Sequence, residues 1–124
     1  MKNTLTIRIK TVDKMLAGFR RSYKAIERGK KPKPQSGAYF TSIEAARNFL
    51  TPERVALLRA IRHERPGSIY ELAKIAERDL KSVQTDVKVL ERHGLVRLRQ
   101  DRSTRRKVKV PEAPYREIAL KIAI

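Results

Sequence analysis

The chain has 124 residues, of which 40% are hydrophobic and 35% charged, and thirty Lys and Arg against thirteen Asp and Glu give a net charge of +17. It contains no cysteine, which excludes disulfides and thiolate-bound metals, and no apolar run approaches the ~20 residues of a membrane-spanning helix. We expect a folded, cytoplasmic, nucleoid-associated protein whose partner is a polyanion, with nucleic acid the first candidate.

The positive charge is unevenly distributed along the chain. Residues 1–40 carry eleven basic and two acidic groups, and residues 41–98 carry eleven and eight. Residues 99–110 carry six basic groups and one acidic group, and the remainder is neutral. The excess therefore lies in the N-terminal region and in one short loop.

The first 37 residues predict a strand, a helix and a linker. Alternation of Leu5, Ile7 and Ile9 with polar residues predicts an edge strand with one buried face. Thr11 is the expected N-cap of an amphipathic helix that ends at Gly29, and the Lys- and Pro-rich residues 30–37 follow as an exposed connection. We expect a module boundary here, between residues 1–37 and 38–124.

The long apolar stripe of that N-terminal helix needs a surface to pack against. Packing within the same chain is one interpretation, and packing on a second copy to form a homodimer is the other. The stripe residues that would form a dimer interface are Met15, Leu16, Phe19, Tyr23 and Ile26. Basic residues of the same helix and linker would then contact phosphates or form a solvated face.

Residues 38–67 predict a short lead-in and two helices. Residues 38–40 suit a short strand, and Thr41 with Glu44 forms a capping box for a helix that ends near residue 50. Thr51-Pro52 is a second helix start, because Thr caps and Pro fits the first helical position. We expect the buried face of this helix to be Val55, Leu58 and Ile61, and Pro66-Gly67 to terminate it.

Two further helices follow in close succession. Ser68 with Glu71 forms a capping box for a helix of about two turns, whose apolar residues are Leu72, Ile75 and Ala76. Asp79 caps the next helix after a three-residue turn. Its apolar face runs through Leu80, Val83, Val87 and Leu90 and ends at Gly94. Two helices joined by so short a turn predict a helix-turn-helix.

The C-terminal part predicts strands. Residues 95–98 and 107–110 suit two strands around a polar, basic loop, residues 99–106, which together form a hairpin wing. After Pro114-Tyr115, alternation of Ile118, Leu120, Ile122 and Ile124 with other residues predicts a last strand. The expected fold is α+β and mostly helical: a winged helix-turn-helix with an N-terminal strand-helix extension and a C-terminal strand.

The helix over residues 80–93 has an outer face suited to DNA. The polar groups on this face are Lys81, Ser82, Gln84, Thr85 and Lys88. In a major groove Gln pairs with adenine, Lys with guanine, and Thr with bases or a thymine methyl, while Ser82 would touch phosphate. An ordinary solvated face is the alternative interpretation.

Two other places are candidate phosphate contacts. Ser68 and Tyr70 open a helix whose free amides attract anions, although Ser68 caps that helix in any case. The wing, residues 99–107, concentrates Arg102, Arg105, Arg106 and Lys107, which would reach the backbone or minor groove or would only keep an edge strand soluble.

No set of residues suits catalysis. His63 and His93 are the only histidines, each near a helix C-terminus, and neither has metal-ligand spacing. There is no glycine-rich phosphate loop, nucleophile elbow or carboxylate cluster. We therefore expect no enzyme activity, no cofactor and no metal.

The segments LTPERVALLRAI, PGSIYELAKIAERDLKSVQTDVKVLERHGLV and KVKVP resemble winged-helix predicted transcriptional regulators of bacteria and archaea related to the MarR group. The resemblance covers residues 39–124 well and the first 38 loosely, and includes short antitoxin-like members. It implies operator binding by the helix of Lys81 to Lys88 and by the wing. The chain lacks the long terminal helices of typical MarR dimers, so their dimer geometry and ligand pocket are not transferred.

The first functional hypothesis is a dimeric, sequence-specific, double-stranded DNA-binding regulator, most simply a repressor. The second is an antitoxin-type protein, in which the N-terminal helix and C-terminal strand hold a toxin and DNA binding adjusts its own expression. The third is a nonspecific nucleic-acid binder, which the basic N-terminal region would suit.

Overall fold

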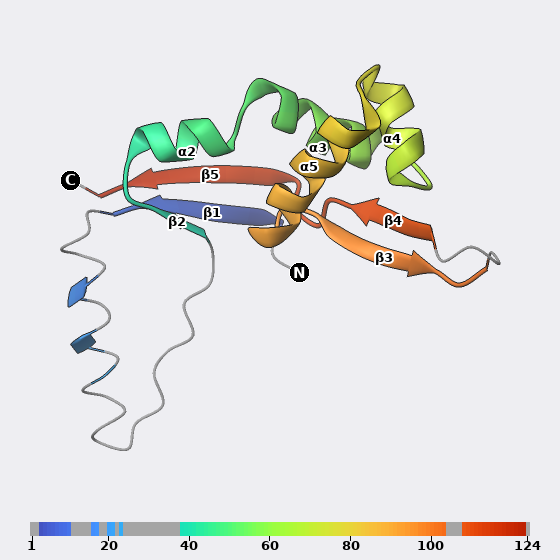
Figure 1. The fold of residues 1–124 in the computed structure, drawn as a ribbon. Helices are drawn as coiled ribbons and strands as arrows, with labels where there is room; N and C mark the ends of the chain where they lie inside the picture. The colour runs from blue at the N-terminus through green and yellow to red at the C-terminus, as the bar shows by residue number, and fades with distance from the viewer. Residues whose placement is uncertain are drawn as a thin grey trace. The chain divides into compact units, whose positions relative to one another are not determined.

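The computed structural model describes residues 3–10, 16–17, 20–21, 23, 38–103 and 108–123. The chain divides into two compact units. The first consists of Met1–Leu5 and Leu50–Glu117, and the second of Thr6–Phe49 and Ile118–Ile124. The expected α+β class is confirmed, and the helices hold more of the described residues than the strands do (Figure 1).

A three-stranded sheet joins segments from both ends of the chain. Its order is β2 (Ala38–Phe40), β1 (Thr4–Ile9), β5 (Glu117–Ile122). Strand β1 was expected at an edge, and this is wrong: it lies in the centre. Its two neighbours come from segments distant in sequence, so its own pattern contained no sign of them.

The predicted alternation in β1 is confirmed, because Leu5, Ile7 and Ile9 are buried. Strand β2 runs parallel to β1, with Ile7 opposite Ala38. Helix α2 (Ile43–Phe49) follows β2 and contacts it. Figure 1 shows the helix next to the sheet. In this unit the ring of Phe49 packs 5.1 Å from that of Phe40, centroid to centroid.

The cap of α2 differs from the expected capping box at Thr41. Ser42 is the capping residue: its Oγ accepts a hydrogen bond from the amide of Ala45 at 3.1 Å. Its carbonyl accepts one from the amide of Ala46. The helix therefore starts one residue later than Thr41 would allow, because the adjacent hydroxyl satisfies the free amide equally well.

Three helices form the core of the first unit. Helix α3 (Pro52–Glu64) begins as predicted, since Thr51 Oγ1 accepts from the amide of Arg54 at 3.2 Å. Helix α4 (Ile69–Ala76) follows, with the Ser68 hydroxyl accepting from the Glu71 amide at 3.0 Å. Helix α5 (Leu80–Arg92) is capped by Asp79, whose carboxylate accepts from the Ser82 amide at 3.0 Å.

In each of these helices, the burial of some apolar residues differs from the prediction. Leu57 is buried in α3 and Val55 only half-buried, because Leu57, Leu58 and Ile61 share one side of the helix. Ile75 is 38% exposed, since it lies roughly 110° from the centre of the buried side of α4. Leu80 is 37% exposed in the first turn of α5.

The hairpin is antiparallel but shifted along the chain. Its strands are β3 (Arg97–Asp101) and β4 (Val108–Glu112), with Arg97 opposite Glu112. Leu95 and Val96 were predicted in the first strand, but they precede β3 and are buried. The reason is that Gly94 has a φ of 80° and the Leu95 amide bonds the Leu90 carbonyl at 2.9 Å, so these residues complete the end of α5.

That shift moves residues 99–101 from the predicted loop into β3. The C-terminal strand is confirmed as β5, although its apolar side chains Leu120 and Ile122 are 48% and 52% exposed. Ile124 lies outside the described residues. So do residues 30–37, expected to form the linker, and most of the residues expected to form the N-terminal helix. Of the latter, Leu16, Ala17, Arg20, Arg21 and Tyr23 are described and helical. No helix in the described ranges is long and apolar enough to cross a membrane.

Replacing Leu90 with Ala is expected to lower the free energy of unfolding by about 2–5 kcal/mol, because the side chain is fully buried and leaves a cavity. Leu80→Ala on the same helix is the matched control and should cost less than about 2 kcal/mol. Urea denaturation followed by circular dichroism measures both. Equal losses would contradict the packing of α5 described above.

Candidate nucleic-acid interface

Helix α5 has one fully buried side and one fully exposed side. Val83, Val87 and Leu90 have no exposed surface, and they hold the helix against α3 and α4. The five predicted contact residues of this helix are all exposed: Lys81, Ser82, Gln84, Thr85 and Lys88. The structure therefore brings them together on the surface of one helix.

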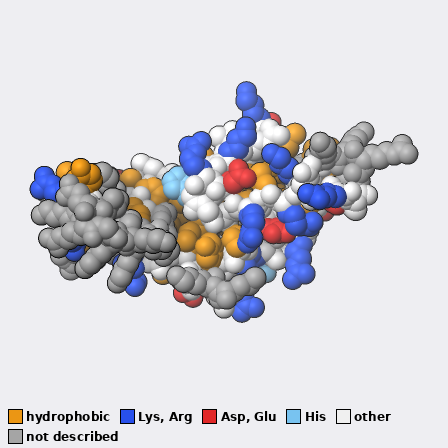
Figure 2. All heavy atoms as spheres, turned by 90° about the horizontal axis from the view of Figure 1, so that it is seen from below, with side chains coloured by type: hydrophobic (Ala, Val, Ile, Leu, Met, Phe, Trp, Pro, Cys, Tyr) orange, Lys and Arg blue, Asp and Glu red, His pale blue; other side chains and the backbone are white. Residues whose placement is uncertain are grey.

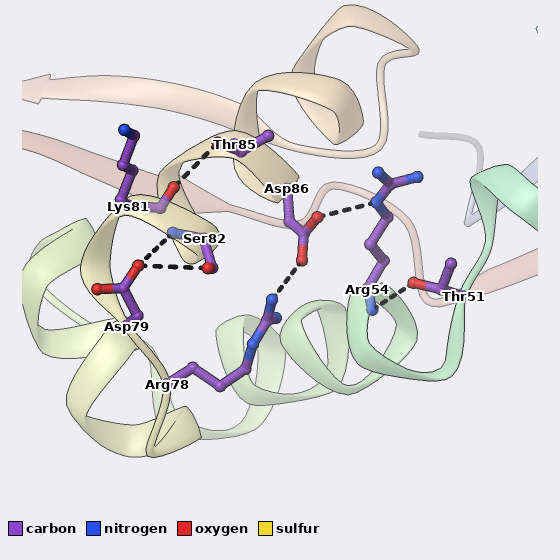
Figure 3. A network of polar contacts seen from close by, with 8 residues as sticks. All are labelled: Thr51, Arg54, Arg78, Asp79, Lys81, Ser82, Thr85 and Asp86. Atoms are coloured by element: carbon purple, nitrogen blue, oxygen red, sulfur yellow. Dashed lines mark hydrogen bonds and ion pairs between the residues drawn. The ribbon is translucent and has the colours of Figure 1, made fainter.

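Two of these five side chains are already hydrogen-bonded to α5 or to its N-cap residue (Figure 3). The Ser82 hydroxyl donates to the Asp79 carboxylate at 3.2 Å, next to the bond from the Ser82 amide. The Thr85 hydroxyl donates to the Lys81 carbonyl at 3.0 Å. Among the described residues, the side chains of Lys81, Gln84 and Lys88 have no hydrogen bond or ion pair. These three are the polar groups of the set left for a ligand.

A cluster of charged residues fixes α5 to its neighbours. The carboxylate of Asp86 accepts from Arg54 Nε of α3 at 3.1 Å and from Arg78 Nη2, in the turn before α5, at 2.8 Å (Figure 3). Only 14% of the Asp86 side chain is exposed, against 18% for Arg54 and 28% for Arg78. One carboxylate thus links three separate segments of the first unit.

The cluster also changes the charge of α5. Both oxygens of Asp86 are occupied by guanidinium groups, so this acid does not oppose the charge of Lys81 and Lys88 on the same helix. The residues Arg54, Arg78 and Asp86 were not predicted as a site from the sequence. Spacing along the chain gave no signal for a contact between residues 32 positions apart.

The N-terminus of α4 is less open to an anion than predicted. Ser68 caps it as expected, and the Glu71 carboxylate accepts from the Gly67 amide at 2.9 Å. The bond occupies the amide of Gly67, which precedes the cap, and it places a carboxylate next to the predicted phosphate contacts. Tyr70 is 59% exposed, with Lys74 Nζ 4.7 Å from its ring centroid. Contact of Ser68 or Tyr70 with phosphate stays a prediction.

Hydrogen bonds between Asp101 and Ser103 fix the end of β3, where the turn of the hairpin begins. Asp101 accepts from the Ser103 hydroxyl at 2.6 Å and the Ser103 amide at 2.9 Å, and these bonds lower the pKa of Asp101. Arg102 is exposed beside it, whereas Arg105, Arg106 and Lys107 lie outside the described residues. The exposed basic residues Arg97 and Lys109, in the two strands, were not predicted as contacts. Lys and Arg side chains are spread over the surface seen in Figure 2.

A hollow of about 440 Å³ lies between the end of α3 and the hairpin. Two of the arginines that line it are already bound. Arg62 Nη1 donates to the Ala113 carbonyl at 2.7 Å, and Arg99 pairs with Glu112 at 2.7 Å. These bonds tie the hairpin to α3 and to itself.

The predicted dimer residues are described only in part. Leu16 and Tyr23 are 51% and 58% exposed, while Met15, Phe19 and Ile26 lie outside the described residues. His93 Nδ1 lies 3.0 Å from the Val89 carbonyl of its own helix. In the described part of the chain, no group of three or more His, Asp or Glu is placed to hold a metal ion.

Replacing Asp86 with Asn is expected to lower the free energy of unfolding by about 1–3 kcal/mol, because two half-buried guanidinium groups lose their counter-charge. The control is Glu112→Gln, which breaks the exposed pair with Arg99 and should cost no more than about 1 kcal/mol. Thermal and urea unfolding of both variants measure the difference. A loss for D86N no larger than that for E112Q would contradict an anchoring role.

The comparison with known proteins identifies one family. No curated protein matches the chain. The model of the HVO_A0114 family matches residues 49–120, more than half of the chain, from the last residue of α2 into β5. The chain belongs to the HVO_A0114 family.

Proposed function

We propose that this protein is a winged-helix regulator that binds double-stranded DNA in a sequence-specific manner, with α5 in the major groove. The observation that carries the proposal is the outer face of α5. There Lys81, Gln84 and Lys88 are exposed, and they have no hydrogen-bond or ion-pair partner among the described residues. The opposite side of the same helix is fully buried, so the face is held outward.

The chemistry of these three groups suits base edges. A Gln amide both donates and accepts, which matches N6 and N7 of adenine, while a Lys ammonium matches O6 and N7 of guanine. A DNA major groove is wide enough to admit a helix. Thr85 is exposed on the same helix and offers its methyl group to thymine, since its hydroxyl bonds Lys81.

Other basic residues of the first unit would bind the sugar-phosphate backbone of the DNA. The hairpin offers Arg102 and the strand residues Arg97 and Lys109 to phosphates or the minor groove, together with the basic residues 105–107 of the sequence. Binding of this kind needs no reaction. The simplest consequence is repression, in which the protein occupies a promoter and excludes other proteins.

The proposal predicts selective loss of sequence discrimination. A preferred site is first selected from random double-stranded DNA, and affinity for it and for base-substituted sites is then measured by fluorescence anisotropy. Gln84→Ala and Lys88→Ala should each reduce discrimination at one base pair by about 5- to 150-fold, the value of one bidentate contact. The control Arg59→Ala removes one exposed positive charge from α3 and should weaken all sites equally. Equal affinity of the wild-type protein for all sequences would overturn specific recognition.

Affinity should also fall steeply with salt, because Lys and Arg displace counterions from phosphates. If the complex makes ~6–10 phosphate contacts, binding should weaken by roughly 10³- to 10⁵-fold between ~50 and ~200 mM salt. Titrations of the selected site at several salt concentrations measure the slope. A flat response would contradict the electrostatic part of the proposal.

A further inference from the structure

Strand β5 has one edge bonded to β1, and no other strand of the described residues pairs with its second edge. It is the outer strand of the sheet order β2-β1-β5 in the described part of the chain. The amides of Glu117 and Ala123 donate to the carbonyls of Asn3 and Ile9, at 3.1 and 3.3 Å. Both strands therefore run in the same direction. Since backbone groups alternate along a strand, the amides and carbonyls of Ile118, Leu120 and Ile122 point away from β1.

This edge lacks the usual protection against pairing. Natural edge strands are blocked by Pro, by several charged residues, by bulges or by very short length. Strand β5 has six residues with the sequence EIALKI, no Pro and two charged residues of opposite sign, Glu117 and Lys121. Leu120 and Ile122 are 48% and 52% exposed, so pairing would also cover apolar surface.

We propose that a second copy of the chain pairs with this edge, strand β5 against strand β5 in antiparallel direction, centred on Ala119. In this register Glu117 lies opposite Lys121 of the partner subunit, and Ile118 lies opposite the partner's Leu120. A two-fold axis repeats each contact, so the dimer has two Glu–Lys pairs and two apolar pairs across the strands.

The charges select this register over its neighbours. Centring the pair on Glu117 or on Lys121 places like charges opposite each other, which is unfavourable. Centring it on Ile118 or Leu120 pairs neither Glu117 nor Lys121 with a residue of the other charge. The register centred on Ala119 also lets the outward amides and carbonyls of Ile118 and Leu120 bond directly to those of the partner's Leu120 and Ile118. The interface does not depend on DNA binding.

Disulfide trapping tests the register, because the wild-type chain has no cysteine. In the Ala119→Cys variant the two thiols would face each other across the axis, within the span of a disulfide. Mild oxidation of the full chain should therefore give a covalent dimer. The control Lys121→Cys places the two thiols several residues apart on opposite sides of the axis and should stay monomeric on a non-reducing gel. No cross-link at residue 119, or equal cross-linking at both positions, overturns the proposed pairing.

Charge reversal tests the same interface without oxidation. Lys121→Glu and Glu117→Lys should each weaken the dimer about tenfold or more in sedimentation equilibrium, because both charge pairs become repulsive. The double variant restores opposite charges and should recover the wild-type dissociation constant. Circular dichroism of each variant verifies that it is folded.

A wild-type chain that is monomeric at all concentrations overturns the proposal. So does a dimer that the single reversals leave unchanged but Tyr23→Ala dissociates, because the interface would then lie on the N-terminal helix. If the protein is monomeric but still binds its selected DNA site, the β5 interface is ruled out and the proposed function stands.

Discussion

Burial of Val83, Val87 and Leu90 sets the rotation of α5 about its own axis, and everything that the helix presents to solvent follows from it. The opposite side of α5 is polar and exposed, as in an amphipathic helix at a protein surface. The Asp86 carboxylate adds a directional restraint, because it holds Arg54 of α3 and Arg78 of the preceding turn together. Apolar packing provides the free energy, and the charged cluster restricts how the helices rotate and slide.

The same contacts decide which polar groups remain for a ligand. Helix caps engage Ser68, Asp79 and Ser82. The Thr85 hydroxyl donates to a carbonyl of its own helix. The arginines of the interhelical cluster are committed to Asp86, and Arg99 is committed to Glu112. A net charge of +17 is therefore a poor guide to the proposed binding surface. The proposal depends on where unbound donors lie together, as they do on the outer face of α5.

The two proposed surfaces belong to different parts of the chain. The outer face of α5 lies in the unit of Leu50–Glu117, whereas the β5 edge is almost entirely in the unit of Thr6–Phe49 and Ile118–Ile124. Substitutions at residue 88 and at residue 121 therefore address separate interactions. The β5 edge follows from a simple property of sheets: an outer strand keeps a row of free backbone groups, and its side-chain order decides whether a copy of itself fits.

Sequence alone determined the elements whose signals are local. Caps at Thr51, Ser68 and Asp79, the alternation in β1 and the apolar side of α5 were all predicted, because each depends on residues within a few positions. Tertiary structure decided the central place of β1, the shift of the hairpin strands and the links of Asp86 to Arg54 and Arg78. These depend on contacts between segments far apart in the chain, and periodicity and capping carry no information about such contacts.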